Sequence, residues 1–295
     1  MKTSSSELLG SLVTTGDSTV ADVIVAHCRK DFDRYVLPLV EQHYLHIGSF
    51  SEKFRLGSCD VYATGAYVML LLRKIPLLES LCFRGKRTPR VFFKLFLLCV
   101  QQRKDIIFAA AFNTLIDHVF DHELCDIPPK KRAAIICSII DGEKNVMGSL
   151  KLLSVLVHEL KDYDLSLFKL WANKEANNLL GKKGKLCFRM YGVDASMRLL
   201  AATIKEKNID IMIAVGSFVQ MIDDYMDAKR DKKAKVQNPF LTGEWTKSSI
   251  TTQYATIKKM LLLYTKDPIL SQLLAATFDH CATELITKMD SGVAV

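Results

Sequence analysis

Apolar residues recur at three- and four-residue spacings along nearly the whole chain, and this period fits the turn of an α-helix. No part of the sequence alternates apolar and polar residues in the way that indicates a half-buried strand. Glycine (14) and proline (7) are both scarce among the 295 residues, which disfavours a fold rich in tight turns. We therefore predict an all-α protein.

The helical pattern begins after a Ser/Thr-rich leader over residues 1–18, which we expect to be flexible. No Pro/Gly/Ser-rich linker interrupts the rest, so we predict a single helical domain over residues 19–295. The expected helices span residues 19–45, 60–82, 89–103, 105–124, 129–146, 148–162, 165–180, 185–206, 208–230, 247–266 and 268–289.

Composition excludes several classes of protein. The chain is 49% apolar and 24% charged, which is typical of a globular protein and not of a disordered one. No apolar run reaches the roughly 18 residues that a membrane span needs, and the N-terminus lacks the apolar core of a secretory signal. The eight cysteines are scattered without a CxxC pair, which indicates reduced thiols. These features predict a cytoplasmic protein.

The net charge of +8 is gathered in short basic clusters at residues 86–90, 130–132, 182–185 and 229–235. Such clusters suit nucleic acid, a membrane surface or a phosphorylated small molecule. The sequence has no RNA-recognition motif, zinc finger or heptad zipper, so we do not expect it to bind nucleic acid.

Two segments have unusual carboxylates. The first, residues 105–126, is apolar on nearly all faces from Ile106 to Ile116, which predicts a centrally buried helix, and it then presents Asp117 and Asp121. Because these residues are four apart, they share one helical face.

The second segment, residues 209–231, is again apolar nearly all round before it presents Asp223, Asp224 and Asp227. Asp223 and Asp227 are four residues apart and share a face, while Asp224 is rotated from Asp223 by about 100°.

Carboxylates at the end of a buried helix are costly unless a positive partner neutralises them. Hard oxygen ligands with open positions suit Mg²⁺, which shares its shell with water and substrate phosphates. If the two helices face each other across a cavity, their aspartates would hold Mg²⁺ ions and a diphosphate between them. The alternative is that both sets lie at solvated helix ends and pair with nearby lysines.

The stretch from Gly216 to Asp227, GSFVQMIDDYMD, resembles the second aspartate-rich motif of trans-isoprenyl diphosphate synthases, FQxxDDxxD. Asp117-His-Val-Phe-Asp121 is similar to their first motif, DDxxD, with His118 in place of the second aspartate. Residues 182–186 look like the family's KTG segment that touches the diphosphate, and residues 85–90 weakly resemble its GGKRxRP loop.

The resemblance implies a class I terpenoid synthase, a helical bundle around a central cavity that binds a prenyl diphosphate through three Mg²⁺ ions. The implied metal ligands are Asp117, Asp121, Asp223, Asp224 and Asp227. Basic side chains at the cavity mouth would grip the diphosphate, unless they are solvated surface charges. These are Lys182, Lys185, Arg189, Arg230 and Arg87.

An apolar and aromatic wall would exclude water and stabilise cations below the metal site. The candidate pocket residues are Phe112, Phe120, Phe218, Gln220, Tyr191, Tyr225 and His118. For each aromatic ring, ordinary core packing is the alternative. By helical face, we expect Asp223 and Asp227 to ligate metal directly and Asp224 to be more peripheral. A neutral imidazole is a poor Mg²⁺ ligand, so we expect His118 to contact a metal-bound water or the diphosphate.

The arginine pair that usually follows the first motif in chain-elongating enzymes is replaced by HELCDIPPKK. We therefore predict a Mg²⁺-dependent terpene synthase, a lyase that ionises and cyclises a linear prenyl diphosphate. The alternatives are a chain-elongating or head-to-head prenyltransferase and a non-catalytic helical scaffold that binds partners through its basic clusters. A homodimer is compatible with the sequence.

Overall fold

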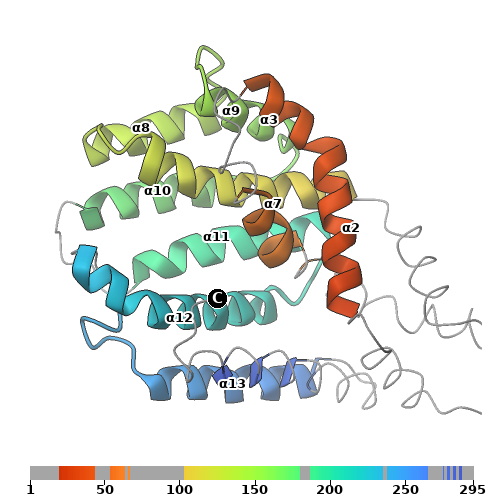
Figure 1. Ribbon diagram of the computed structural model, residues 1–295, viewed down its shortest axis with the longest axis vertical. Coiled ribbons are helices and arrows are strands. Elements are labelled where there is room, and N and C mark those ends of the chain that lie inside the picture. The colour runs from red at the N-terminus through yellow and green to blue at the C-terminus, as the bar shows by residue number, and fades with distance from the viewer. Residues whose placement is uncertain are drawn as a thin grey trace, which may run out of the picture. The chain divides into compact units, whose positions relative to one another are not determined.

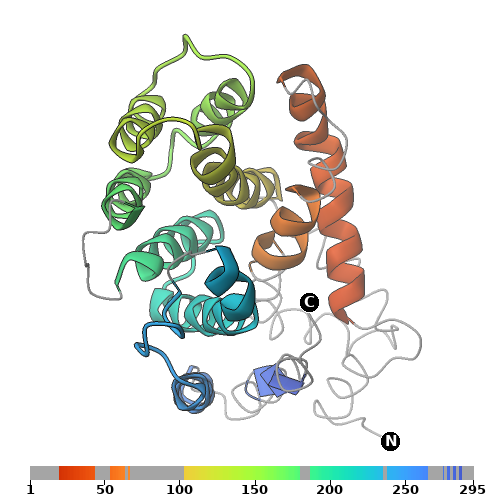
Figure 2. The same cartoon turned by 60° about the vertical axis from the view of Figure 1, so that its left-hand side comes forward.

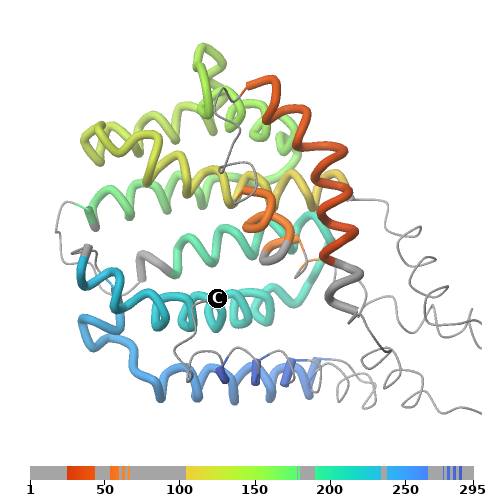
Figure 3. Tube along the Cα trace, viewed as in Figure 1, coloured from red at the N-terminus to blue at the C-terminus, as the bar shows by residue number. Residues whose placement is uncertain are grey.

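The computed structural model describes residues 20–43, 54–63, 66, 103–179, 187–234, 238–264, 275, 278–279, 282–283 and 286–287 (Figure 3). Within these ranges every regular element is a helix and no strand is present. The predicted all-α fold class is therefore confirmed for the described residues. The predicted leader over residues 1–18 lies outside them.

The chain divides into two compact units, each described here by itself. Unit 1 comprises residues 1–184 and 199–206, and unit 2 comprises residues 185–198 and 207–295. The expectation of one domain over residues 19–295 stays a prediction.

Unit 1 is built around a helix that is buried along most of its length (Figure 1). This helix, α7, packs against α2, the π-helical turn η1 and α9, while α8 lies along α10. Figure 2 shows α7 to α10 foreshortened, in a view turned by 60° from that of Figure 1. The elements are α2 (Val20–Tyr35), α3 (Leu37–His43), η1 (Gly57–Ala63), α7 (Arg103–His118), η2 (Val119–Glu123), α8 (Pro129–Ile140), α9 (Ser149–Glu159) and α10 (Ser166–Leu179).

The apolar segment of α7 is buried, as its sequence predicts. Every residue over 106–113 is buried, and Phe112 packs edge-on against Phe168 of α10 with ring centroids 4.9 Å apart. Polar contacts fix the start of the helix, because the Tyr163 hydroxyl donates to Asp105 over 2.7 Å. The carboxylates that follow are thus presented from a helix anchored in the core of unit 1.

Unit 2 contains the second aspartate-bearing helix. Its elements are residues 187–198 of α11 (Cys187–Thr203), α12 (Ile209–Ala234) and α13 (Lys247–Leu262). Gly216 permits close packing of α12 on α11, since a Cβ at this position would lie 2.8 Å from Cγ of Met197. On the α13 side, Gln253 Nε2 donates to the carbonyl of Ala214 over 3.0 Å. These contacts hold α12 between two helices of its own unit.

Most helix positions agree with the sequence prediction, and two differ for identifiable reasons. The predicted helix over 19–45 breaks at Val36, because Pro38 has no amide hydrogen to continue the helical ladder. The predicted helix over 129–146 ends at Ile140, where Gly142 adopts a φ of 102° that stops the helix. The predicted helices over 60–82, 89–103 and 268–289 lie largely outside the described residues.

Among the described helices, none has the combination of length and apolar character that crossing a membrane requires.

Candidate functional site

Asp117 and Asp121 lie where α7 changes into a π-helical turn. Asp117 is in the last turn of α7, Asp121 is in η2, and both side chains are exposed. The π character is visible in the bond from the Leu124 amide to the Val119 carbonyl, five residues back, over 3.0 Å. Such single π turns occur frequently at functional sites. The first motif thus begins in an α-helix and ends in a π turn.

Arg132 holds the chain in place directly after this turn. From α8, its guanidinium donates to the carbonyls of Phe120, at 3.3 Å, and Cys125, while Nε donates to Ile127 over 2.7 Å. The same guanidinium lies 5.9 Å from the centre of the Phe120 ring. Carbonyls at a helix end have no partner within the helix, and Arg132 supplies one. It therefore fixes the backbone that bears Asp121.

His118 has partners within the same turn. Its Nε2 lies 3.5 Å from Oε1 of Glu123, and its ring lies 4.9 Å from that of His122. His118 and Glu123 are five residues apart, and a π turn brings residues at this spacing together. The expected contact of His118 with a metal-bound water or a diphosphate stays a prediction.

The second motif lies within one continuous α-helix and presents two carboxylates toward solvent. Asp223 is exposed, and the Asp227 side chain is 27% exposed. Arg230, three residues further along α12 and 73% exposed, donates a hydrogen bond to Asp227. In this structure the predicted diphosphate-binding arginine thus neutralises a predicted metal ligand.

The neighbouring, inward-facing side of α12 contains a buried polar network that sequence reasoning did not identify. Asp224 is 1% exposed, Asp231 is 7% exposed and Asn238 is 1% exposed. The Asn238 side-chain amide donates to the Asp224 carbonyl over 2.6 Å and to the Asp231 carboxylate over 2.9 Å. One asparagine therefore connects the helix to the loop that follows it and gives the buried Asp231 carboxylate a donor.

The three aspartates of the second motif lie on two sides of α12, as the helical geometry predicts. Asp223 and Asp227 lie toward solvent, and Asp224 lies toward the interior of unit 2. The seven-residue interval between Asp224 and Asp231 was the available signal for the buried pair, since residues seven apart also share a face. Direct metal ligation by Asp223 and Asp227 stays a prediction.

Most of the residues expected to grip a diphosphate are outside the described part of the structure. Arg87, Lys182 and Lys185 lie in segments that are not described, and Arg189 is placed only as part of the α11 backbone. Arg230 is described, and its contact with Asp227 is the one given above. Their joint role in binding a diphosphate stays a prediction.

Two predicted pocket residues of unit 1 are buried in aromatic pairs. Phe112 packs against Phe168, and Phe120 packs against Trp171 with centroids 5.4 Å apart. Both rings are 0% exposed, so protein atoms cover them in this structure. Their role in a substrate pocket stays a prediction.

The aromatic candidates of unit 2 also have ring partners. Phe218 packs edge-on against Phe278 with centroids 5.5 Å apart, and Tyr225 packs edge-on against Phe240 at 5.2 Å. These pairs stabilise the packing around α12. Two further pocket candidates are half-buried, Tyr191 on α11 and Gln220 on α12.

The donor chemistry of each segment suits Mg²⁺. The ion is commonly bound by one or two carboxylates, with water and substrate phosphates in the remaining positions. Each segment offers two carboxylates on its accessible side, namely Asp117 with Asp121 and Asp223 with Asp227. Within the described ranges, no group of three or more His, Cys, Asp or Glu side chains could hold a metal ion.

Comparisons with protein-family models, with curated proteins and with solved structures give no match to this chain. A function for this chain is therefore inferred from its motifs and from the geometry of the two segments.

Proposed function

We propose that this chain is a Mg²⁺-dependent class I terpene synthase that ionises and cyclises a linear prenyl diphosphate. The observation that best supports this function is the division of α12, which keeps Asp224 buried and turns Asp223 and Asp227 outward. Asp223 and Asp227 are about one helical turn apart on the accessible side, which is the spacing at which two carboxylates share a face and can bind one cation. The exposed pair formed by Asp117 and Asp121 provides the matching second set.

In this function the four accessible carboxylates bind cations, because ionised aspartates only accept and cannot donate to a phosphate. Bound Mg²⁺ would neutralise the charge that develops on the departing diphosphate. Arg230 has five N–H donors, which suit phosphate oxygens once the arginine leaves Asp227. The substrate C–O bond breaks, its electron pair leaves with the diphosphate oxygen, and the carbon cation closes a ring before it loses a proton.

Cyclisation is favoured over chain elongation by the structure after the first motif. Chain-elongating enzymes with a similar first motif usually have an arginine pair directly after it. In this chain the first arginine that follows Asp121 is Arg132. Its guanidinium donates to three backbone carbonyls and so is committed to the fold. A cytoplasmic location and a homodimer stay predictions.

The decisive test incubates the pure protein with Mg²⁺ and prenyl diphosphates of ten to twenty-five carbons, each with and without isopentenyl diphosphate. We expect release of diphosphate and a cyclic product without isopentenyl diphosphate, and no turnover in excess chelator. A longer diphosphate formed only with isopentenyl diphosphate would identify a prenyltransferase. Absence of turnover with every substrate would contradict both enzymatic functions.

A further inference from the structure

Unit 1 contains a pocket of about 570 Å³ that is lined by the end of α8, by α9, by the start of α10 and by the loops that join them. None of the residues that line it belongs to either aspartate-bearing segment. Its volume is within the range of roughly 300–1,000 Å³ that is usual for small-molecule sites. The charged side chains that line it are Lys144, Lys151, Lys161, Lys169, Asp141 and Asp164, with His158 beside them.

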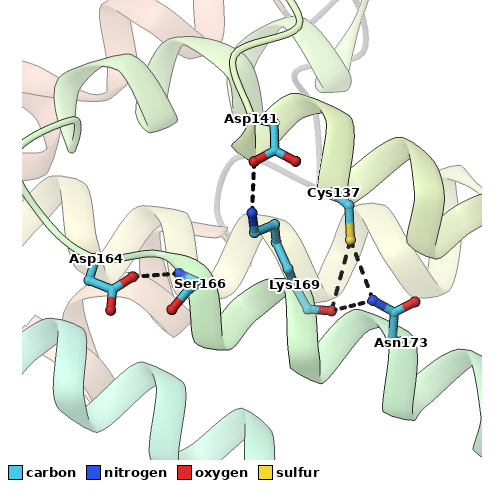
Figure 4. Close-up of polar contacts among 6 residues, drawn as sticks. All are labelled: Cys137, Asp141, Asp164, Ser166, Lys169 and Asn173. Atoms are coloured by element: carbon cyan, nitrogen blue, oxygen red, sulfur yellow. Dashed lines mark hydrogen bonds and ion pairs between the residues drawn. The ribbon is translucent and has the colours of Figure 1, made fainter.

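Both carboxylates of the pocket are already engaged by the protein. Asp141 accepts a hydrogen bond from Lys169 over 2.7 Å, which joins the end of α8 to α10 (Figure 4). Asp164 accepts from the Ser166 amide over 2.9 Å at the start of α10, and these hydrogen bonds from Ser166 lower the pKa of Asp164. The first amide of α10 is consequently occupied and is not available to a ligand.

The remaining lysines are held around the pocket without matching carboxylates. Among the described residues, neither Lys144 nor Lys161 forms an ion pair, and Lys151 donates to the Lys144 carbonyl over 3.4 Å. The loop that bears Lys144 is fixed to α9, because Ser154 Oγ donates to the Glu143 carbonyl over 3.1 Å. Four lysines and two aspartates leave the lining with a net charge of +2.

The walls between the lysines include two partly accessible apolar side chains, Ile140 and Val155, whereas Ile139, Val157 and Leu165 are already buried. A purely polar anion would leave these walls uncovered, whereas a ligand with an apolar part would remove them from water. A phosphate monoester has a charge of about −1.5 to −2 at neutral pH, which matches the excess of the lining.

We propose that this pocket binds a small molecule with a phosphate monoester group and an apolar part, in a way that requires no metal ion. The phosphate lies between Lys144, Lys151 and Lys161, and the apolar part lies against the isoleucine and valine side chains. The site is independent of the proposed terpene synthase activity, because it uses no aspartate of either segment.

The test measures binding of octyl phosphate by calorimetry in EDTA, with inorganic phosphate as the probe that lacks an apolar part. Chelation excludes the Mg²⁺-dependent binding expected at the aspartates. We expect octyl phosphate to bind at least tenfold more tightly than inorganic phosphate. Octyl phosphate that binds no better than phosphate, or only when Mg²⁺ is added, would overturn the proposal.

Two double variants, each of which removes two positive charges from unit 1, test whether the position of the charges matters. We expect the K144Q/K161Q double variant to lose roughly tenfold in affinity, since it loses two charge-assisted contacts. The control is K130Q/K131Q, which changes two exposed lysines at the start of α8, and it should bind within twofold of the unchanged protein. An equal loss in both variants would show attraction by overall charge and would contradict a built site.

A further experiment distinguishes a free small molecule from a lipid headgroup as the ligand of the pocket. Vesicles of phosphatidylcholine that contain phosphatidic acid present the same phosphate monoester on a surface. Because the site is a hollow, we expect octyl phosphate to bind and these vesicles not to retain the protein in sedimentation. Retention that K144Q/K161Q abolishes, without binding of octyl phosphate below its micelle concentration, would contradict a small-molecule site.

Discussion

In the segment around Asp117 the carboxylates stand where a helix ends, whereas around Asp223 they stand in the middle of one. The first pair depends on a π turn and on Arg132, which reaches back from the next helix to three carbonyls. The second pair depends on an unbroken α-helix whose buried side is bonded to Asn238. The two pairs of aspartates have the same spacing in the sequence, but different local structures hold them in position.

The difference shows where each segment is vulnerable. At the helix end, the position of Asp121 depends on a surface-accessible guanidinium, so its loss should change the site before it unfolds the protein. In α12, the position of Asp223 follows from helical geometry, and the sensitive point is the buried polar network behind it. Substitutions at matched positions can separate these two kinds of support.

The largest effect should come from the carboxylates themselves. We expect Asp117→Ala and Asp223→Ala each to reduce kcat/KM at least a thousandfold, about 4 kcal/mol, because the charge on the leaving diphosphate is no longer neutralised. Both side chains are exposed, so the denaturation midpoint should hardly change. Product assays and denaturant titrations measure the two quantities.

Asp210→Ala is the matched control, because Asp210 is an exposed carboxylate on the same helix as Asp223. It should retain activity. If instead Asp117→Ala or Asp223→Ala lost activity together with its fold, both segments would be structural helix ends, and the proposed function would lose its main support.

A smaller effect, on stability alone, is expected for Asn238→Ala. The substitution removes the buried amide that donates to both the Asp231 carboxylate and the Asp224 carbonyl, which should lower the free energy of unfolding by about 3 kcal/mol. Denaturant unfolding measures this. Asn173→Ala, which removes an exposed amide from α10, should cost well under 1 kcal/mol. Equal losses would show that the network behind α12 is unimportant.

Arg132→Lys should cost about 2 kcal/mol of unfolding free energy, because an ammonium cannot span three separate carbonyls. It should also raise the Mg²⁺ concentration needed for half-maximal activity, since Asp121 is held less firmly. Lys131→Met, which removes the neighbouring exposed charge, should do neither. A lysine variant with unchanged stability and unchanged Mg²⁺ dependence would refute this role for Arg132.

The smallest effect is expected for His118→Ala, roughly tenfold in kcat/KM or about 1.4 kcal/mol. The substitution removes the contact with Glu123 and no expected metal ligand. Asp227→Ala should be far more damaging in the same assay. If the two were equally damaging, or if Asp224→Ala exceeded both, the assignment of metal ligands by helical face would be wrong.

The sequence indicates the helices well, because the three- and four-residue spacing of apolar residues can be recognised within a short stretch of the chain. The interior position of α7 and the different orientations of Asp223 and Asp224 follow from spacing alone. The roles of Arg132 and Asn238 do not, because each depends on a chain reversal that periodicity does not describe. By composition, Arg132 is one of three basic residues at the start of α8, yet it differs from Lys130 and Lys131 in reaching three carbonyls. The π turn is equally invisible in the spacing of Asp117 and Asp121.

The π turn also makes the first segment sensitive to chain length. Its five-residue hydrogen bond, from Leu124 to Val119, accommodates one residue more than an α-helical turn would. Inserting one more residue between Val119 and Glu123 would exceed what this hydrogen bond accommodates, and every later side chain would then be rotated by about 100°. The carbonyls that Arg132 reaches would turn with them. The segment should therefore tolerate many exchanges of side chain but no added residue between α7 and Arg132.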